Sequence, residues 1–325
     1  MAEKKGIAVA GTVIVDRINE ISAYPKSGEL TQILNIQKAI GGCVPNVALD
    51  LKKISPDLPV RVFGRVGNDE DGTYVRKTLD DAGLDTTGLL TDENAPTSFT
   101  EVMSVTGGQR TFFTYSGASA EFGTDDVDFG EDLPEILHLG YFLLLQKVDD
   151  GDGLEILKAA KAKGVRTSID LVSENSDRYA LVKPCLPYTD YLIINEMEAG
   201  MLAGIDPTNE NLKAIAEKLM ALGVRQKVII HKPDCAVCLS NTGFTVMPSY
   251  ALPAGYIKGT TGAGDAFCAG ALYGIYGGWS DTQILEFASA TAVMALGSKD
   301  ATSGLVEEKA IKEFCEGLPR QNVTL

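Results

Sequence analysis

Short apolar runs alternate with longer amphipathic stretches along most of the chain. The runs expected to form strands are Ile7–Val15, Val60–Val66, Ile136–Leu139, Val165–Ile169, Tyr191–Ile194 and Lys227–Ile230. In Gly153–Lys163 and Leu212–Leu222 apolar residues recur three and four positions apart, which is typical of helices, and a glycine follows each stretch. This alternation predicts a mostly parallel sheet covered by helices on both faces, a three-layer α/β/α architecture.

Two segments, residues 14–40 and 97–116, break the alternation. Both hold strand-like runs that no helix follows at the spacing of a βαβ unit; in the second, Phe99–Val105 and Arg110–Tyr115 flank Gly107-Gly108. The two segments predict a small β-sheet lid over a site in the α/β body. The alternative is that they extend the edge of the main sheet. An exposed lid edge is a candidate contact between two copies of the chain, a homodimer.

The last third of the chain has a different pattern. Cys235–Leu239 and Phe244–Met247 flank Asn241-Thr242-Gly243 and predict an antiparallel hairpin. Three helices are expected after about residue 258, at Gly262–Tyr276, Asp281–Leu296 and Glu307–Glu316.

Composition narrows the classes of partner. Lys and Arg number 29 and Asp and Glu 44, which gives a net charge of −15. Such a charge repels nucleic acid and anionic membranes, so we expect neither as a partner. We find no signal peptide and no apolar run near the ~20 residues that span a bilayer, and we expect a cytoplasmic protein.

The CxxC pair of the chain does not indicate a metal or redox site. Of the six, only Cys235 and Cys238 form a CxxC, with no second pair and no His pattern nearby. We expect buried thiols.

Residues 257–270, IKGTTGAGDAFCAG, carry the clearest chemical signal. An extended run ends at Thr260-Thr261, three small residues follow, and a helix starts with Asp265 near its first turn. Small residues allow a tight turn, and the unpaired N–H groups of a helix start carry the positive end of its dipole. The segment predicts an anion site that needs no Lys or Arg, which suits an acidic protein.

Asp265 beside this site has two candidate roles. It is a preferred residue type for capping a helix. It could instead act as a general base that takes a proton from an attacking hydroxyl, while the anion site stabilises a transferred phosphoryl group. The spacing alone leaves both roles open.

Four motifs together resemble the ribokinase/PfkB family of sugar kinases. TGAGD followed by Ala-Phe and Gly270 resembles its C-terminal signature, and Gly41-Gly42 with Asn46 opening a helix resembles its N-terminal signature. Gly64–Gly72 resembles the family's Gly-x-Asp-x-x-Gly turn, and Asn195–Glu198 its Asn-x-x-Glu motif. Because the motifs occur in family order, the resemblance implies one ribokinase-like kinase domain over residues 1–325, with a β-sheet lid.

The resemblance also implies residue roles and a reaction, transfer of the γ-phosphoryl group of ATP to a hydroxyl of a small carbohydrate. Asp265 corresponds to the base and Gly262, Ala263 and Gly264 to the anion hole. The positions implied in substrate binding are Asp16, Gly41, Gly42 and Asn46, and those implied in nucleotide binding are Thr261, Gly264, Asn195 and Glu198. Glu198 would reach Mg²⁺ through water. Asp170 is a secondary candidate near the phosphates, and the adenine pocket is expected around Ala288–Ala292.

Three departures from the family pattern qualify these implications. Gly259 stands where many members have an Asp that helps to hold a monovalent cation, which argues against activation by potassium. His231–Ala236 lacks the two glycines of a nucleotide-binding turn, and Lys232 there either reaches a phosphate or faces solvent. Cys43 follows the Gly-Gly pair where ribokinases commonly carry Lys, which argues against ribose as the substrate.

Other residues have simpler interpretations. His138 is expected in the core, Trp279 in packing, and Arg110 either binds a substrate anion or is an exposed lid residue. The alternatives to a sugar kinase are a nucleoside kinase of the same fold and a degenerate, non-catalytic sugar or nucleotide sensor. The absence of GxxxxGK[ST] argues against a P-loop kinase, and the absence of GxGxxG after the first strand argues against a Rossmann dehydrogenase.

Overall fold

A central sheet forms the body of the protein. The computed structural model describes residues 5–105, 110–173 and 177–324, and within them this sheet has nine strands in the order β13-β12-β11-β10-β9-β8-β1-β4-β5. Their bounds in that order are Gly243–Pro248, Cys235–Ser240, Lys227–His231, Tyr191–Asn195, Arg166–Leu171, Ile136–Phe142, Ile7–Gly11, Val60–Gly67 and Asp85–Asp92. Pairing is parallel except at β11-β12 and β12-β13, which confirms the predicted sheet and the predicted hairpin.

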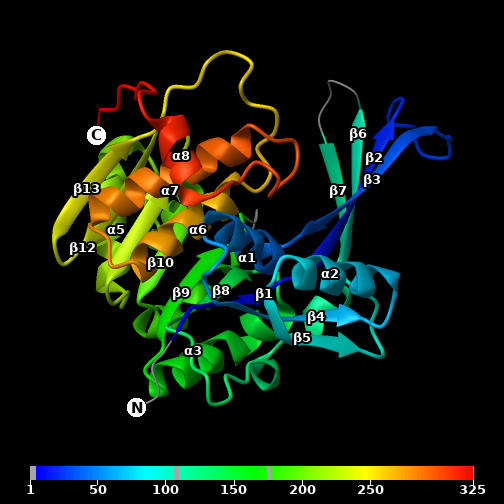
Figure 1. The fold of residues 1–325 in the computed structure, drawn as a ribbon, viewed down its shortest axis with the longest axis horizontal. Coiled ribbons are helices and arrows are strands. Elements are labelled where there is room, and N and C mark those ends of the chain that lie inside the picture. Colours follow the sequence, from blue (N-terminus) through cyan, green and yellow to red (C-terminus); the bar gives the residue numbers. More distant parts are fainter. Residues whose placement is uncertain (1–4, 106–109, 174–176, 325) are drawn as a thin grey trace.

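Helices cover both faces of this sheet, as Figure 1 shows. One core lies under α1 (Cys43–Ile54), α2 (Glu70–Asp81), α6 (Ala263–Tyr276), α7 (Asp281–Leu296) and α8 (Glu308–Cys315). The other lies under α3 (Gly153–Ala162), α4 (Glu196–Ala203) and α5 (Leu212–Ala221). The three-layer architecture predicted from the alternating pattern is therefore confirmed.

A second, smaller sheet projects from the body (Figure 1). Its order is β3-β2-β6-β7, with bounds Ile33–Gly41, Ile14–Ile21, Phe99–Val105 and Arg110–Tyr115. These strands pair with one another and not with the main sheet, so the alternative that they extend its edge is wrong. We call this sheet the lid. Gly107-Gly108 lies outside the described residues.

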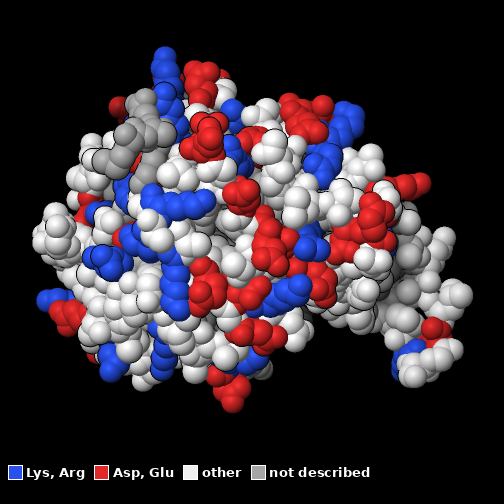
Figure 2. All heavy atoms as spheres, turned by 90° about the horizontal axis from the view of Figure 1, so that it is seen from below, with Lys and Arg blue, Asp and Glu red and all other residues white. Residues whose placement is uncertain are grey.

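Charged side chains of both signs share the surface. Figure 2 shows Asp and Glu interspersed with Lys and Arg on the face seen from below. None of the helices in the described part of the chain combines the length and the apolar character that a bilayer crossing requires.

The turn at Gly64–Gly72 attaches the lid to the body. Asp69 caps α2 by accepting from the N–H of Gly72 at 2.7 Å, and it also accepts from the N–H and hydroxyl of Thr97 at 2.8 and 2.6 Å. Thr97 lies two residues before the start of β6. Asp71 in the same turn pairs with Arg17 of β2 at 2.6 Å and with Lys38 of β3. One acidic turn therefore binds the bases of three lid strands.

Replacing Asp69 by Ala should destabilise the protein by about 2–3 kcal/mol, because a helix cap and two hydrogen bonds to Thr97 are lost together. Urea unfolding followed by circular dichroism measures the change. The control is Asp81→Ala, whose exposed pair with Lys77 lies at the other end of α2 and should contribute less than about 1 kcal/mol. Equal stability of the two variants would contradict the anchoring role of Asp69.

Candidate active site

The glycine-rich segment lies where the chain enters α6. Gly262 precedes the helix with φ at 78°, a conformation that favours glycine. A Cβ atom there would lie 2.5 Å from the Cα of Ala301, so no side chain fits. Ala263 and Gly264 begin the helix, whose first N–H groups have no partners inside it. The backbone thus has the local geometry of an anion-binding helix start.

Asp265 does not cap this helix. The residue before the helix is Gly262, and no side chain caps its first turn, so the capping interpretation is wrong. The carboxylate instead accepts from Asn46 Nδ2 at 2.9 Å and from the Tyr141 hydroxyl at 3.0 Å to each oxygen. Asn46 belongs to α1 and Tyr141 to β8, so three elements distant in sequence converge on one group.

The environment of Asp265 favours its protonated form. The residue is 6% exposed. Burial raises its pKa to about 7; the charge of Asp170 also raises it, while the hydrogen bonds from Asn46 and Tyr141 lower it. A carboxylate with a pKa near neutrality is a suitable proton acceptor at physiological pH.

Tyr141 was missed by the sequence analysis. Its φ is 61°, which is uncommon for a bulky residue and indicates local strain. Its backbone N–H donates to Asp170 Oδ1 at 2.6 Å while its hydroxyl donates to Asp265. The one available signal was its position near the carboxyl end of a central parallel strand, where ligands of α/β proteins bind.

The predicted substrate residues lie at the junction of lid and body. A Cβ atom at Gly41 would lie 2.5 Å from Asp16 Oδ2, so glycine is what lets this carboxylate lie against β3. Gly42 has φ at 90°, and a Cβ atom there would lie 2.5 Å from the carbonyl oxygen of Thr12. Burial raises the pKa of Asp16 to about 6. Gly42 leads directly into α1, whose first turn contains Asn46.

One face of the lid carries Asp16. In the strand register Asp16 pairs with Thr100, and Thr100 pairs with Thr114. Side chains alternate along a strand, so Phe112 and Arg110 share the face of Thr114. Arg110 Nη1 donates to Thr261 Oγ1 at 3.2 Å, which links the lid to the segment before α6.

Asn195 and Glu198 form a capping box at the start of α4. Asn195 Oδ1 accepts from the N–H of Glu198 at 2.9 Å, and Glu198 Oε2 accepts from the N–H of Asn195 at 3.1 Å. Ser173 donates to Glu198 Oε1 at 2.9 Å. Burial raises the pKa of Glu198 to about 7, and the charge of Asp170 adds to this. The two residues therefore stabilise the start of α4, and their role in nucleotide binding stays a prediction.

Lys232, which follows β11, was expected either to reach a phosphate or to face solvent, and the structure shows neither. Lys232 pairs with Asp234 at 3.2 Å and donates to Asn209, and its side chain is 15% exposed. It neither faces solvent nor is free to reach a phosphate. The imidazole of His231 packs against the start of α6: a Cβ atom at Gly264 would lie 3.7 Å from its Cε1. Burial lowers the pKa of His231 to about 4, so its imidazole is neutral.

Gly259 lies against the loop that follows α7. A Cβ atom there would lie 2.8 Å from the carbonyl oxygen of Ser298 and 3.2 Å from that of Lys299. Any side chain at this position would have to displace backbone. The structure therefore gives a steric reason for glycine at this position, where many family members have an aspartate. The expectation that potassium does not activate the protein stays a prediction.

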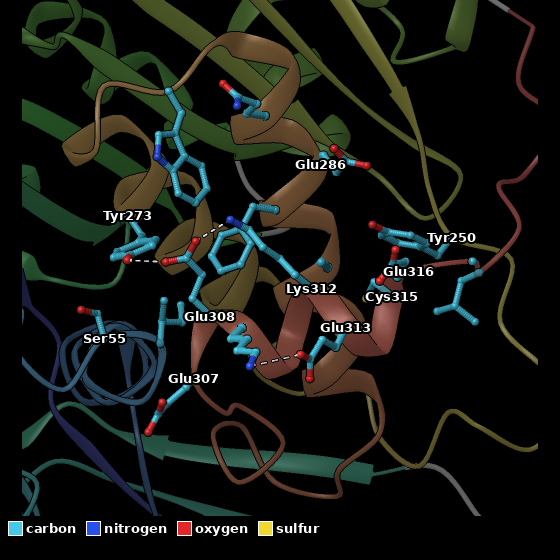
Figure 3. A pocket seen from close by; sticks show the side chains of 18 of the residues that line it. Ser55, Tyr250, Tyr273, Glu286, Glu307, Glu308, Lys312, Glu313, Cys315 and Glu316 are labelled. Carbon is cyan, nitrogen blue, oxygen red and sulfur yellow. Dashed lines mark hydrogen bonds and ion pairs between the residues drawn. The ribbon is translucent and has the colours of Figure 1, made fainter.

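A large cleft lies away from these residues, between α7, α8 and the end of α1 (Figure 3). It has a volume of about 1180 Å³, and Asp265 and Asn46 do not line it. Lys312 lies over the ring of Trp279 at 4.6 Å, and Trp279 packs edge-on against Tyr273 and Phe287, as expected for a packing residue. Of the window Ala288–Ala292, Ala290 lines this cleft and Ala288 is buried.

The mostly parallel sheet with its small second sheet defines a ribokinase-like fold. Residues 4–308 match the pfkB family carbohydrate kinase, and the chain belongs to this family, whose members are phosphotransferases with an alcohol group as acceptor.

Curated relatives and solved structures agree with this assignment. The chain is 27% identical to a ribokinase of Arabidopsis thaliana over 94% of this chain and 79% of the relative. It is 24% identical to a 5-dehydro-2-deoxygluconokinase of Clostridium perfringens, over 88% of this chain and 86% of the relative. A ribokinase structure from Thermotoga maritima has a TM-score of 0.80 at 22% identity, over 96% of this chain and all of that one. The structure of Arabidopsis thaliana ribokinase complexed with ribose and ATP has a TM-score of 0.80 at 24% identity, over 96% and 98%.

Asp265→Asn should stabilise the protein more at high pH than at low pH. The pKa of Asp265 is higher in the folded protein, at about 7, than its ordinary value near 4. The free energy of unfolding of the parent therefore falls as pH rises from about 4 to about 7, because the carboxyl loses its proton in the folded state. The free energy of unfolding of Asp265→Asn, relative to the parent, should be roughly 2 kcal/mol more favourable at pH 8.5 than at pH 5.5. Urea titration at the two pH values measures it.

The control is Asp281→Asn. Asp281 is also buried, but hydrogen bonds from Lys227, Ser240 and Thr242 outweigh burial and lower its pKa. Its ionised form therefore stabilises the fold, and the variant should be less stable than the parent at both pH values. An effect of Asp265→Asn that does not vary with pH would contradict the raised pKa.

Proposed function

We propose that this protein transfers the γ-phosphoryl group of ATP to a hydroxyl of a small carbohydrate, with Asp265 as general base. The observation that carries the proposal is the placement of Asp265 in the first turn of α6, directly after the Gly262-Ala263-Gly264 helix start. A base beside an anion site can deprotonate an alcohol while the backbone N–H groups stabilise the phosphoryl group that this alcohol attacks.

The substrate would lie between Asp265 and the lid. Asp16 on the lid face and Asn46 beside the base are the polar groups that would orient its hydroxyls. The lid contact between Arg110 and Thr261 would help to exclude water, which otherwise competes as phosphoryl acceptor. Curated relatives include a ribokinase and several 5-dehydro-2-deoxygluconokinases, so sugars and keto sugar acids are the first substrates to examine.

The residues near α4 fit a divalent cation. Glu198 is buried beside the charge of Asp170, and among the described residues no basic side chain pairs with it. Mg²⁺ would offset the negative charge of the phosphates there. Glu198 would hold it through water, and Asn195 would contribute to nucleotide binding. Thr261 and Gly264 would contact the phosphates from the helix start.

The proposal is tested by a coupled ADP-release assay with ATP and Mg²⁺ over sugars, sugar acids and nucleosides. At pH 8, above the pKa of about 7 for Asp265, we expect substrate-dependent turnover on a carbohydrate. Asp265→Asn should reduce kcat by roughly 10²–10⁴-fold, the usual contribution of a general base. The control Asp81→Asn makes the same chemical change on an exposed residue of α2 and should leave kcat unchanged.

Each outcome of this assay distinguishes one alternative. Turnover on nucleosides alone would establish the nucleoside kinase. ATP binding without turnover on any substrate would favour the degenerate sensor. Turnover that survives in a folded Asp265→Asn variant would contradict the assigned base.

We also propose that the protein forms a homodimer through the lid. The edge strands β3 and β7 are exposed along most of their length. The large apolar side chains exposed on them are Ile33, Leu34, Ile36, Phe112, Phe113 and Tyr115. Unpaired edges with exposed apolar residues favour association with a second chain.

Ile36→Lys should convert a dimer to a monomer in light scattering, because it places a charge on a residue that is 67% exposed in β3. Leu181→Lys is the control, since Leu181 is 46% exposed outside the lid. A monomeric parent protein, or a dimer unaffected by Ile36→Lys, would contradict the lid interface.

A further inference from the structure

A buried group of potential metal ligands lies near Asp265, and the proposed reaction does not use it. Cys43 is the first residue of α1, His138 lies in β8 and Asp170 in β9. One ligand atom from each lies within 4.8 Å of the others. Cys43 and His138 are fully buried and Asp170 is 7% exposed. A thiol, an imidazole and a carboxylate are the three ligand types that zinc takes in proteins.

The spacing of these atoms suits a tetrahedral ion. His138 Nε2 is 3.5 Å from Asp170 Oδ2. The sulfur of Cys268, a fourth buried side chain, lies 3.6 Å from Nε2 and 4.0 Å from Nδ1, beside the imidazole ring. With zinc bonds of ~2.0–2.3 Å, neighbouring ligands of a tetrahedron are roughly 3.3–3.8 Å apart. The edge between His138 and Asp170 therefore already has the required length, the Cys43 ligand atom lies within 4.8 Å of both, and the Cys268 side chain reaches the ion by rotation.

The second ring nitrogen of His138 has the partner that a metal ligand requires. Nδ1 lies 3.1 Å from Ser168 Oγ, a hydrogen bond whose direction depends on the tautomer. When Nδ1 donates to Ser168, Nε2 keeps its lone pair for an ion, and Asp170 Oδ2 lies 3.5 Å from this nitrogen. Metal-binding histidines are oriented by such outer hydrogen bonds.

The local charge and packing also favour a cation. Asp170 and Asp265 both lie close enough to act electrostatically on the Cys43 and Cys268 thiols, and their negative charge attracts a cation. Among the described residues no Lys or Arg forms an ion pair with Asp170. Gly140 makes the convergence sterically feasible, because a Cβ atom there would lie 1.8 Å from the Cys43 sulfur and 3.0 Å from Asp170 Oδ1.

We propose that Cys43, His138 and Asp170, with Cys268 as the fourth ligand, form a binding site for a thiophilic divalent ion such as Zn²⁺. The site lies close to the residues proposed for substrate binding, because Cys43 follows Gly42 directly and Asp170 lies near the carboxyl end of β9. The CxxC pair offers no comparable site. Cys235 and Cys238 alternate across β12, so their thiols lie in the two different cores of the sheet.

An ion at this site would act on the base through Tyr141. Asp170 Oδ1 accepts from the N–H of Tyr141, and the Tyr141 hydroxyl donates to Asp265. Drawing Asp170 toward a cation would weaken the first of these bonds and disturb the second. Zn²⁺ should therefore inhibit the enzyme, an expectation that rests on the proposed function, whereas the binding site does not.

The test is a Co²⁺ titration of the full-length, reduced protein, followed by absorption spectroscopy. We expect a thiolate-to-cobalt charge-transfer band and the visible bands of a tetrahedral site, saturating at one ion per chain and displaced by Zn²⁺. Cys43→Ser and Cys268→Ser should each weaken the charge-transfer band. Ser168→Ala keeps all four ligands and should lower the affinity by roughly 10–100-fold.

Cys238→Ser, which removes a buried thiol far from the site, is the control and should leave the spectrum unchanged. Circular dichroism establishes that each variant is folded. A parent protein without a charge-transfer band would overturn the site, as would a band that depends on Cys238 and not on Cys43. Because the titration needs neither ATP nor sugar, its failure is distinguishable from failure of the kinase assay.

Discussion

The carboxylate of Asp265 is held nearly without water between the amide of Asn46 and the hydroxyl of Tyr141, and the arrangement of the site follows from this contact. Burying an ionisable group is unfavourable unless it is hydrogen-bonded, so the three elements that supply these side chains have to meet accurately. The first turn of α1, the end of β8 and the start of α6 meet at one edge of the sheet. That edge is where the glycine-rich backbone and the lid also converge.

Most of the fold followed from patterns that are local in sequence. Alternating apolar runs and amphipathic stretches predicted the sheet and its two helical layers, and the segments at 14–40 and 97–116 were correctly separated from it. The strand Asp85–Asp92 was not predicted, because TTGLLTD lacks a continuous apolar run. The capping box at Asn195 was predictable as an ordinary helix start, since its partners are three residues apart.

The site was harder to predict because its contacts join residues distant in the chain. Nothing near Tyr141 indicates that it reaches Asp265, 124 positions later. His138 was correctly expected in the core, but its neighbours Cys43 and Cys268 come from helices on either side of it in sequence. Lys232 was expected to face solvent; one of its two partners, Asp234, is local, but the other, Asn209, precedes it by 23 residues. The packing of the sheet, which no short motif encodes, determines these contacts.

The Tyr141 hydroxyl has a consequence for selectivity among ligands. In the structure it donates to both oxygens of Asp265, so an alcohol that bound this carboxylate, as the proposed function requires, would compete with it. A ligand that brings an alcohol to this point exchanges one O–H···O bond for another at little net expense. A deoxy analogue would break the bond to tyrosine and supply nothing in return, leaving a desolvated oxygen unpaired. Discrimination against molecules that lack the reactive group can therefore begin at binding, before any phosphate is transferred.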